Sequence, residues 1–173
     1  MNGLYEAADE AHRFFQARGW RYCIIGGLAV ARWGQPRATQ DVDISLFTGW
    51  GDEQSYIEPM LARFPSRIPD AARFAMENRV LLVKASNGVA LDVALAAFPL
   101  EEEMIGRATP FRFAAGVELI TVCAEDLIVL KAFAGRDIDW SDVGGVIIRQ
   151  ADRLDWDLVL STLKSLCELN ADG

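Results

Sequence analysis

The chain has 173 residues, 51% of them apolar and 24% charged, which suits one folded domain and excludes disordered and fibrous classes. Its 17 basic and 25 acidic side chains give a formal net charge of −8. That balance excludes a surface that is basic throughout and binds nucleic acid by charge alone.

We expect no membrane helix or secretory signal from the sequence. The longest uncharged apolar run, residues 22–31, is far shorter than the roughly 20 residues that a membrane helix requires. The first twenty residues are acidic where a secretory signal would be basic and then apolar. Cys23, Cys123 and Cys167 form no CxxC pair, and His12 is the one histidine, so neither disulfides nor zinc is expected. We expect a cytoplasmic protein without membrane association.

Hydrophobic periodicity, glycine stops and the Asn87-Gly88 turn signal predict mixed α/β structure. In chain order, helices are expected at 3–18, 28–33, 53–64, 70–78, 99–108, 124–134, 141–150 and 156–169, and strands at 21–25, 41–47, 80–85, 89–96, 111–113 and 117–122. His12 lies off the apolar stripe of the first helix, which indicates a solvated position. The order describes a mixed sheet flanked by helices, followed by an all-helical tail.

Two aspartates stand on the polar side of one predicted strand. Residues 41–47 alternate strictly, so Asp41 and Asp43 project together while Val42 and Ile44 face the other way. In the run 89–96, Asp92 likewise lies opposite the apolar face. Three converging carboxylates repel one another unless a cation neutralises them, and hard oxygen ligands favour Mg²⁺ or Mn²⁺.

Most other catalytic signatures are missing. The chain has no GxSxG elbow, P-loop or GxGxxG motif, and its one histidine leaves no catalytic triad in view. What accompanies the carboxylates is a Gly26-Gly27 turn between a strand and a helix, which can aim backbone N–H groups at an anion. An anion site beside a metal pair indicates phosphoryl or nucleotidyl transfer.

Three segments carry a family resemblance: IIGGLAVARWGQPRATQDVDISL (24–46), VALDVAL (89–95) and EDLIVLKAFAGRDIDWSDV (125–143). Together they resemble the polymerase-beta-like nucleotidyltransferase superfamily, in the small bacterial branch that includes AbiEii-type toxins of abortive-infection and toxin–antitoxin systems. The resemblance implies an α/β (α+β) nucleotidyltransferase fold, with residues 1–122 as catalytic core and 123–173 as a helical part that completes the cleft.

The same resemblance implies a Mg²⁺-dependent transfer of NMP from an NTP to an acceptor hydroxyl, with release of pyrophosphate. The acceptor would be an RNA 3′ end such as that of tRNA, a protein or a small molecule. A toxin role with a cognate antitoxin partner is also implied. An RNA acceptor would be favoured if the basic side chains cluster: Arg37, Arg107, Arg112, Lys131 and Arg136.

By resemblance, Asp41 and Asp43 bind both metal ions, and Asp92 completes the site of the ion that activates the acceptor. Nucleotide contacts are implied for six further residues: Gly26, Gly27, Arg37, Thr39, Lys131 and Asp142. Many superfamily members have Gly-Ser where this chain has Gly26-Gly27, so a serine contact to phosphate is missing here.

Other interpretations of these residues stay open at this point. Lys131 lies on a nearly apolar helix, where a lysine that extends its stem to solvent is as compatible as a phosphate contact. Arg37 and Thr39 are equally compatible with loop residues that brace Asp41. At the level of the whole protein, the alternative is a catalytically idle nucleotide-binding protein that uses the same fold as an interaction surface.

Overall fold

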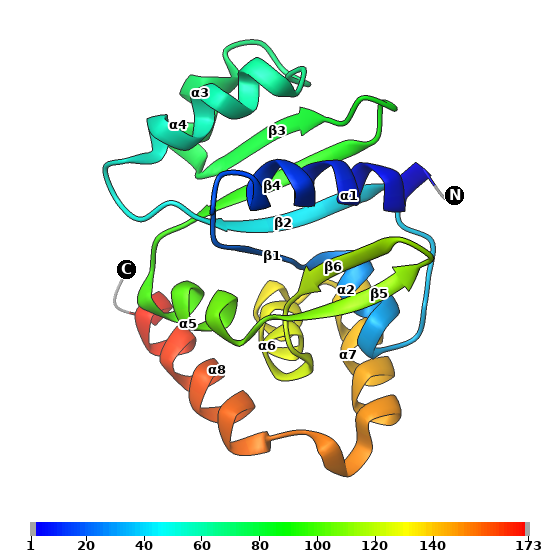
Figure 1. The fold of residues 1–173 in the computed structure, drawn as a ribbon. Coiled ribbons are helices and arrows are strands. Elements are labelled where there is room, and N and C mark those ends of the chain that lie inside the picture. The colour runs from blue at the N-terminus through cyan, green and yellow to red at the C-terminus, as the bar shows by residue number, and fades with distance from the viewer. Residues whose placement is uncertain (1–2, 172–173) are drawn as a thin grey trace.

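A computed structural model describes residues 3–171, with side chains described through residue 168. The chain forms these elements in order: α1 (Gly3–Gln16), β1 (Tyr22–Ile24), α2 (Gly26–Trp33), β2 (Asp41–Phe47), α3 (Glu53–Arg63), α4 (Ala71–Asn78), β3 (Val80–Lys84), β4 (Ala90–Ala96), α5 (Pro99–Arg107), β5 (Thr109–Ala114), β6 (Val117–Thr121), α6 (Ala124–Ala134), α7 (Asp137–Gln150), the short 3₁₀ turn η1 (Ala151–Arg153) and α8 (Trp156–Ala171). Figure 1 shows the arrangement.

The six strands described form one mixed sheet in the order β3-β4-β2-β1-β6-β5. Strand β2 pairs in parallel with β4 and antiparallel with β1, and β1 pairs in parallel with β6. The β3–β4 and β5–β6 pairs are antiparallel hairpins at the two edges. The mixed α/β fold expected from the sequence is thereby confirmed.

Each face of the sheet carries its own apolar core (Figure 1). Helices α1, α3 and α4 cover one face, where Phe15, Phe64 and Ile44 of β2 belong to the same buried apolar cluster. Residues of α2 and α5–α8 form the second core around Cys23 and Val122. This second core joins strands of the front half to helices after residue 122, so the helical part packs directly on the sheet.

Helix α2 begins earlier than predicted, at Gly26 instead of residue 28. Glycine disfavours helix interiors, so the sequence placed the pair in a turn. Gly26 keeps a left-handed φ of +60°, which suits a turn, and the first turn of α2 lies so close to β2 and its preceding loop that there is no room for a side chain at Gly26 or Gly27.

Two other differences from the predicted boundaries have a clear physical reason. Helix α7 begins at Asp137 instead of residue 141, and the acidic Asp137 and Asp139 occupy its first turn, where the helix dipole favours negative charge. Strand β5 extends from Thr109 and includes Pro110. A proline is tolerated there because β5 is an edge strand of the sheet.

His12 is also placed differently from the prediction. It is half-buried, and its ring nitrogen forms a hydrogen bond with the Tyr22 hydroxyl. Cys23, Cys123 and Cys167 carry free thiols, as expected. Within residues 3–171, no helix combines the length and the hydropathy of a membrane-spanning segment.

Phe15 is the residue chosen to test how much the first apolar core contributes to stability. It is fully buried, and its ring packs against Phe14, Trp20 and Tyr22. Phe15→Ala should lower the free energy of unfolding by about 3 to 5 kcal/mol, because truncating a buried ring leaves a cavity. Urea denaturation measures this, with the half-exposed Phe98→Ala as control. A loss below about 1 kcal/mol for Phe15→Ala would contradict the packing described.

Candidate active site

Three aspartates meet on the face of the sheet that carries the second core. Asp43 of β2 lies directly beside Asp92 of β4 in the parallel register, and Asp41 precedes Asp43 on the same side of β2. One carboxylate oxygen from each residue lies within 4.8 Å of the other two. All three side chains are half-buried. The convergence predicted from the alternation of residues 41–47 and 89–96 is present.

The cluster concentrates negative charge away from bulk water. Burial, followed by the charges of Asp41 and Asp92, raises the pKa of Asp43 above its ordinary value. Burial also raises the pKa of Asp92, where the positive charge of Arg67 acts in the opposite direction and Asp41 adds to the rise. Three oxygen donors under mutual repulsion fit a hard divalent cation such as Mg²⁺ or Mn²⁺.

The glycine pair permits the closest approach in the site. A Cβ on Gly26 would lie 1.8 Å from Asp43 Oδ2, and one on Gly27 would lie 2.6 Å from Thr39 Cβ and Oγ1. Gly26 also has a φ of +60°, which a side chain disfavours. The Gly27 amide donates to the Asp43 carboxylate. The start of α2 therefore orients Asp43, and a triphosphate contact by these glycines stays a prediction.

Thr39 and Arg37 have different partners. The Thr39 hydroxyl donates to Asp41 Oδ1 at 3.0 Å, so Thr39 braces a member of the acidic cluster. Arg37 instead donates to both carboxylate oxygens of Asp142 on α7, at 2.8 and 2.9 Å. The loop before β2 is thereby tied to the helical part of the chain. Nucleotide contacts by Arg37 and Thr39 stay predictions.

Lys131 is buried among carboxylates instead of extending to solvent. Its Nζ lies 2.8 Å from Asp139 Oδ1 and 3.0 Å from Asp142 Oδ2. Its charge also reaches the acidic cluster, where it acts to lower the pKa of Asp43. Two of the nine residues predicted as site residues, Lys131 and Asp142, thus pair with each other beside the aspartate triplet.

Sequence reasoning missed Asp139, which is fully buried at the start of α7. Hydrogen bonds from Arg136 and then Lys131 outweigh the effect of burial and lower the pKa of Asp139 to about 2. The available signal was the three-residue spacing between Asp139 and Asp142, which puts both carboxylates on one helix face. The predicted helix begins at residue 141, which leaves Asp139 outside it. A shared helix face for the two carboxylates could therefore not be inferred.

Arg67 was also missed. Its guanidinium contacts Asp92 Oδ1, and it lies in the irregular segment between α3 and α4, where no local pattern marked it. The contact depends on how that segment folds back onto the sheet, which is a tertiary feature.

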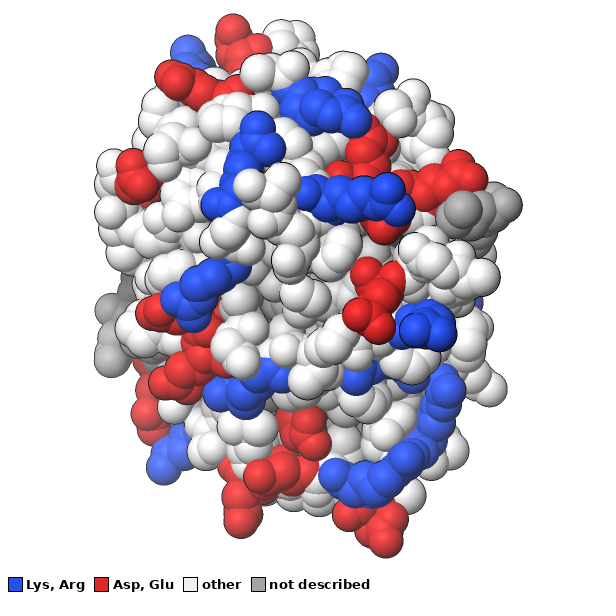
Figure 2. Space-filling model, viewed as in Figure 1, with Lys and Arg blue, Asp and Glu red and all other residues white. Residues whose placement is uncertain are grey.

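The basic residues do not form an unpaired cluster. Arg37, Lys131 and Arg136 gather around Asp139 and Asp142, while Arg107 donates to both oxygens of Asp126 at 2.9 Å. Arg112 lies apart from them on edge strand β5. On the face in Figure 2, basic and acidic side chains are interspersed. Three of the five basic residues therefore gather and two lie apart, and an RNA acceptor stays a prediction.

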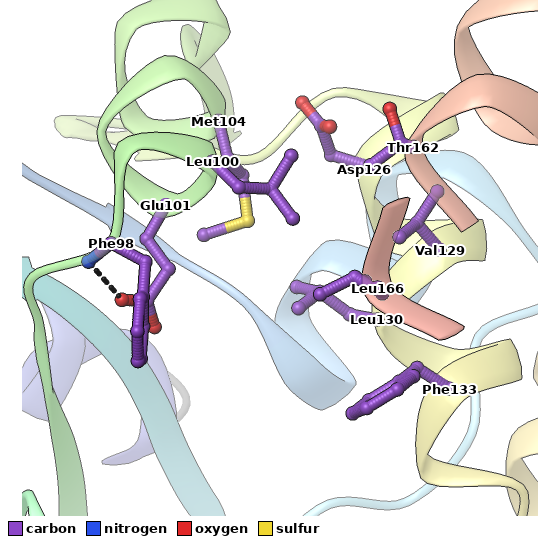
Figure 3. A pocket seen from close by; sticks show the side chains of 10 residues that line it. All are labelled: Phe98, Leu100, Glu101, Met104, Asp126, Val129, Leu130, Phe133, Thr162 and Leu166. Carbon is purple, nitrogen blue, oxygen red and sulfur yellow. Dashed lines mark hydrogen bonds between the residues drawn. The ribbon is translucent and has the colours of Figure 1, made fainter. Parts of the chain in front are cut away.

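A separate apolar cavity of about 530 Å³ lies between α5, α6 and α8. Figure 3 shows its lining: Phe98, Leu100, Glu101, Met104, Asp126, Val129, Leu130, Phe133, Thr162 and Leu166. Val129 and Phe133 are each two residues from Lys131, which places them about 200° around α6 from the lysine. The cavity and the acidic cluster therefore lie on opposite sides of α6.

The fold and the site together define the class of protein to which the chain belongs. A helix that begins with two glycines, followed by a strand with paired aspartates and a third aspartate on the parallel neighbour, occurs here on a nucleotidyltransferase fold. The chain belongs to the family described as "Nucleotidyltransferase of unknown function (DUF6036)", whose profile matches residues 3–171. No curated protein matched the chain.

Solved structures of low sequence identity share the fold. The antibiotic-resistance factor ANT(2'')-Ia is 18% identical, with a TM-score of 0.59 over 92% of this chain and 89% of its own. An antigenic nucleotidyltransferase-like protein from Paracoccidioides brasiliensis is 14% identical, with a TM-score of 0.55 over 98% and 89%. The lincosamide antibiotic adenylyltransferase LnuA is 13% identical, with a TM-score of 0.53 over 81% and 97%.

Asp139→Asn should destabilise the protein at pH 7 by about 3 kcal/mol, because Lys131 loses a buried partner. A carboxylate whose folded pKa is depressed adds stability above its unfolded pKa, and that stability is lost as the pH falls through the folded value. The difference from the wild type should therefore shrink between about pH 4 and pH 2. Urea denaturation across this range measures it, with the exposed Asp152→Asn as control. A pH-independent difference would contradict the ion pairing.

Asp43→Asn should have the opposite effect on the metal-free protein. A raised pKa means that the folded state resists the charged carboxylate, so the neutral isostere relieves repulsion at pH 7. We expect the melting temperature to rise by about 3 °C in EDTA. Differential scanning calorimetry measures the shift, and the exposed Asp152→Asn serves as matched control. A lower melting temperature for Asp43→Asn alone would contradict the account of the cluster.

Proposed function

We propose that this protein catalyses Mg²⁺-dependent transfer of NMP from an NTP to a hydroxyl of a small-molecule acceptor. The observation that carries the proposal is the triplet of aspartates, with one carboxylate oxygen from each within 4.8 Å of the others. Family membership supports the nucleotidyl chemistry. The catalytic and metal-binding roles of Asp41, Asp43 and Asp92 are part of this proposal.

The reaction is a substitution at the α-phosphorus of the NTP. The acceptor O–H bond breaks with release of a proton, and the acceptor oxygen bonds to the α-phosphorus. The bond between the α-phosphorus and the oxygen that bridges to the β-phosphate breaks, and pyrophosphate leaves. Bound Mg²⁺ would supply electrostatic stabilisation to the triphosphate and to the hydroxyl oxygen. Asp41, Asp43 and Asp92 would hold it, and Thr39 keeps Asp41 oriented for this task.

Lys131 is suited to contact a phosphate. An ammonium group has three hydrogens to donate. Its Nζ lies 2.8 and 3.0 Å from Asp139 and Asp142, which account for two of them. One donor is therefore left for an anion, and its position near Asp43 supports an assignment to the triphosphate. Arg37 and Asp142 would then act by fixing the lysine, since Arg37 holds Asp142 in place.

A small acceptor is favoured over RNA by the charges around the site. Lys131 and the arginines at 37, 107 and 136 are paired with aspartates, which leaves little positive charge for a phosphodiester backbone. Two structural neighbours, ANT(2'')-Ia and LnuA, are described as an antibiotic-resistance factor and an antibiotic adenylyltransferase. Their low identity supports the fold alone, so the acceptor class rests on the charge argument.

The branch and cellular role are finer proposals. Membership of the AbiEii-type branch, a cognate antitoxin and a cytoplasmic location are the expectations of the sequence resemblance. Induced expression of the wild type and of Asp43→Asn in bacteria tests the toxin role. Growth arrest by the wild type alone supports it, and unimpaired growth in both cultures opposes it.

The central experiment uses each α-³²P-labelled NTP with Mg²⁺ and three separate acceptor pools: hydroxylated small molecules including aminoglycosides and lincosamides, tRNA, and cell protein. We expect label and equimolar pyrophosphate with the small-molecule pool. Asp43→Asn should lower the rate on the order of 100-fold or more, because it removes a charged metal ligand. Asp152→Asn should be unaffected.

Other outcomes separate the alternatives. Label in tRNA or protein would keep the chemistry and overturn the acceptor class. NTP binding without pyrophosphate in every pool would favour the catalytically idle nucleotide-binding protein. Equal rates in the wild type and Asp43→Asn would contradict the proposed mechanism.

A further inference from the structure

Arg67 is a positively charged residue in direct contact with the acidic cluster. Its guanidinium donates to Asp92 Oδ1, and the same pair forms an ion pair. Asp92 is the member of the triplet that comes from β4 instead of β2. The group that would complete a metal site therefore already has a cationic partner from a different part of the chain.

The backbone at Arg67 is fixed to the sheet. Ser66 forms a β-bridge with Val83, and the Arg67 amide donates to the Leu82 carbonyl at 3.0 Å. Leu82 is in turn the register partner of Asp92 on β4. The segment thus runs along the outer edge of β3, level with Asp92, and the long arginine side chain reaches across one strand to the carboxylate. This placement makes the contact a built feature of the sheet.

The two side chains are partly open to solvent. Those of Arg67 and Asp92 have exposed fractions of 30% and 32%, so water reaches the ion pair and a dissolved cation can approach the carboxylate. An ion pair of this exposure is worth little, about 1 kcal/mol or less in comparable cases, which corresponds to about a fivefold change in an equilibrium constant. A divalent cation that binds the same carboxylate is strong enough to compete with such a partner.

We propose that Arg67 is a resident counter-cation that exchanges with a divalent metal ion at Asp92. In the metal-free protein its guanidinium offsets part of the repulsion within the triplet. When metal binds across the triplet, the guanidinium leaves Asp92 and moves outward. Arg67 thereby weakens binding of the ion that would contact Asp92, relative to an ion that contacts Asp41 and Asp43 alone.

This inference rests on the proposed metal-dependent function and deepens it with a mechanism of metal loading. It predicts two metal sites of unequal affinity in the absence of nucleotide. It also predicts that removal of Arg67 has opposite effects on the empty and the loaded protein. The empty protein loses a favourable charge contact, whereas the loaded protein loses a competitor.

The test is Mn²⁺ binding without nucleotide, measured by electron paramagnetic resonance of free Mn²⁺ in the wild type, Arg67→Met and Arg67→Lys. We expect about a fivefold tighter second site in Arg67→Met and a smaller change in Arg67→Lys. Calorimetry in EDTA should show a lower melting temperature for Arg67→Met. Arg73→Met removes an exposed arginine of α4 that pairs with Glu77, and it should match the wild type in both measurements.

The variant Asp92→Asn tests whether the second Mn²⁺ site includes Asp92. It should abolish the second Mn²⁺ site, and adding Arg67→Met to it should change Mn²⁺ binding no further. Suppose that the wild type binds Mn²⁺ and that Asp43→Asn does not. Unchanged or weaker Mn²⁺ binding by folded Arg67→Met would then overturn only the role proposed for Arg67. Equal Mn²⁺ binding by the wild type and Asp43→Asn would overturn the metal site itself, and with it both proposals.

Discussion

Repulsion among three carboxylates on one face of the sheet is the constraint on which the site depends. The parallel register of β2 and β4 places Asp43 beside Asp92, and the apolar residues on the other face hold that register through the first core. A shift by one residue would turn the acidic side chains into that core. The fold therefore accepts an unfavourable concentration of charge, which is typical of sites that bind a ligand of opposite sign.

Several groups around the triplet moderate this charge without removing it. Arg67 contacts Asp92, the Gly27 amide donates to Asp43, and Thr39 donates to Asp41. Each carboxylate thus has one neighbouring donor in contact with it. One carboxylate oxygen from each residue lies within 4.8 Å of the other two, which is close enough for the three to share a divalent ion.

A second charged network, around Lys131, Asp139 and Asp142, joins the helical part to the loop before β2. The carboxylates of this network form ion pairs with Lys131, Arg37 and Arg136. The network therefore stabilises the fold, whereas the carboxylates of the triplet repel one another. Both networks meet at Lys131, whose charge reaches Asp43. The sheet and the helices after residue 122 therefore share one electrostatic centre.

The sequence by itself determined the mixed α/β fold, most element positions and the shared face of Asp41 and Asp43, because strict alternation along a strand is a local signal. The parallel pairing of β2 with β4, which brings Asp92 beside Asp43, is a tertiary feature. Only the tertiary structure decided the partners of Arg37 and Lys131, the burial of Asp139 and the contact of Arg67 with Asp92. It also decided that α2 begins at Gly26, where the close approach of Asp43 leaves no room for a side chain. These features depend on which segments distant in the chain meet in space, and single-residue preferences carry no information on that.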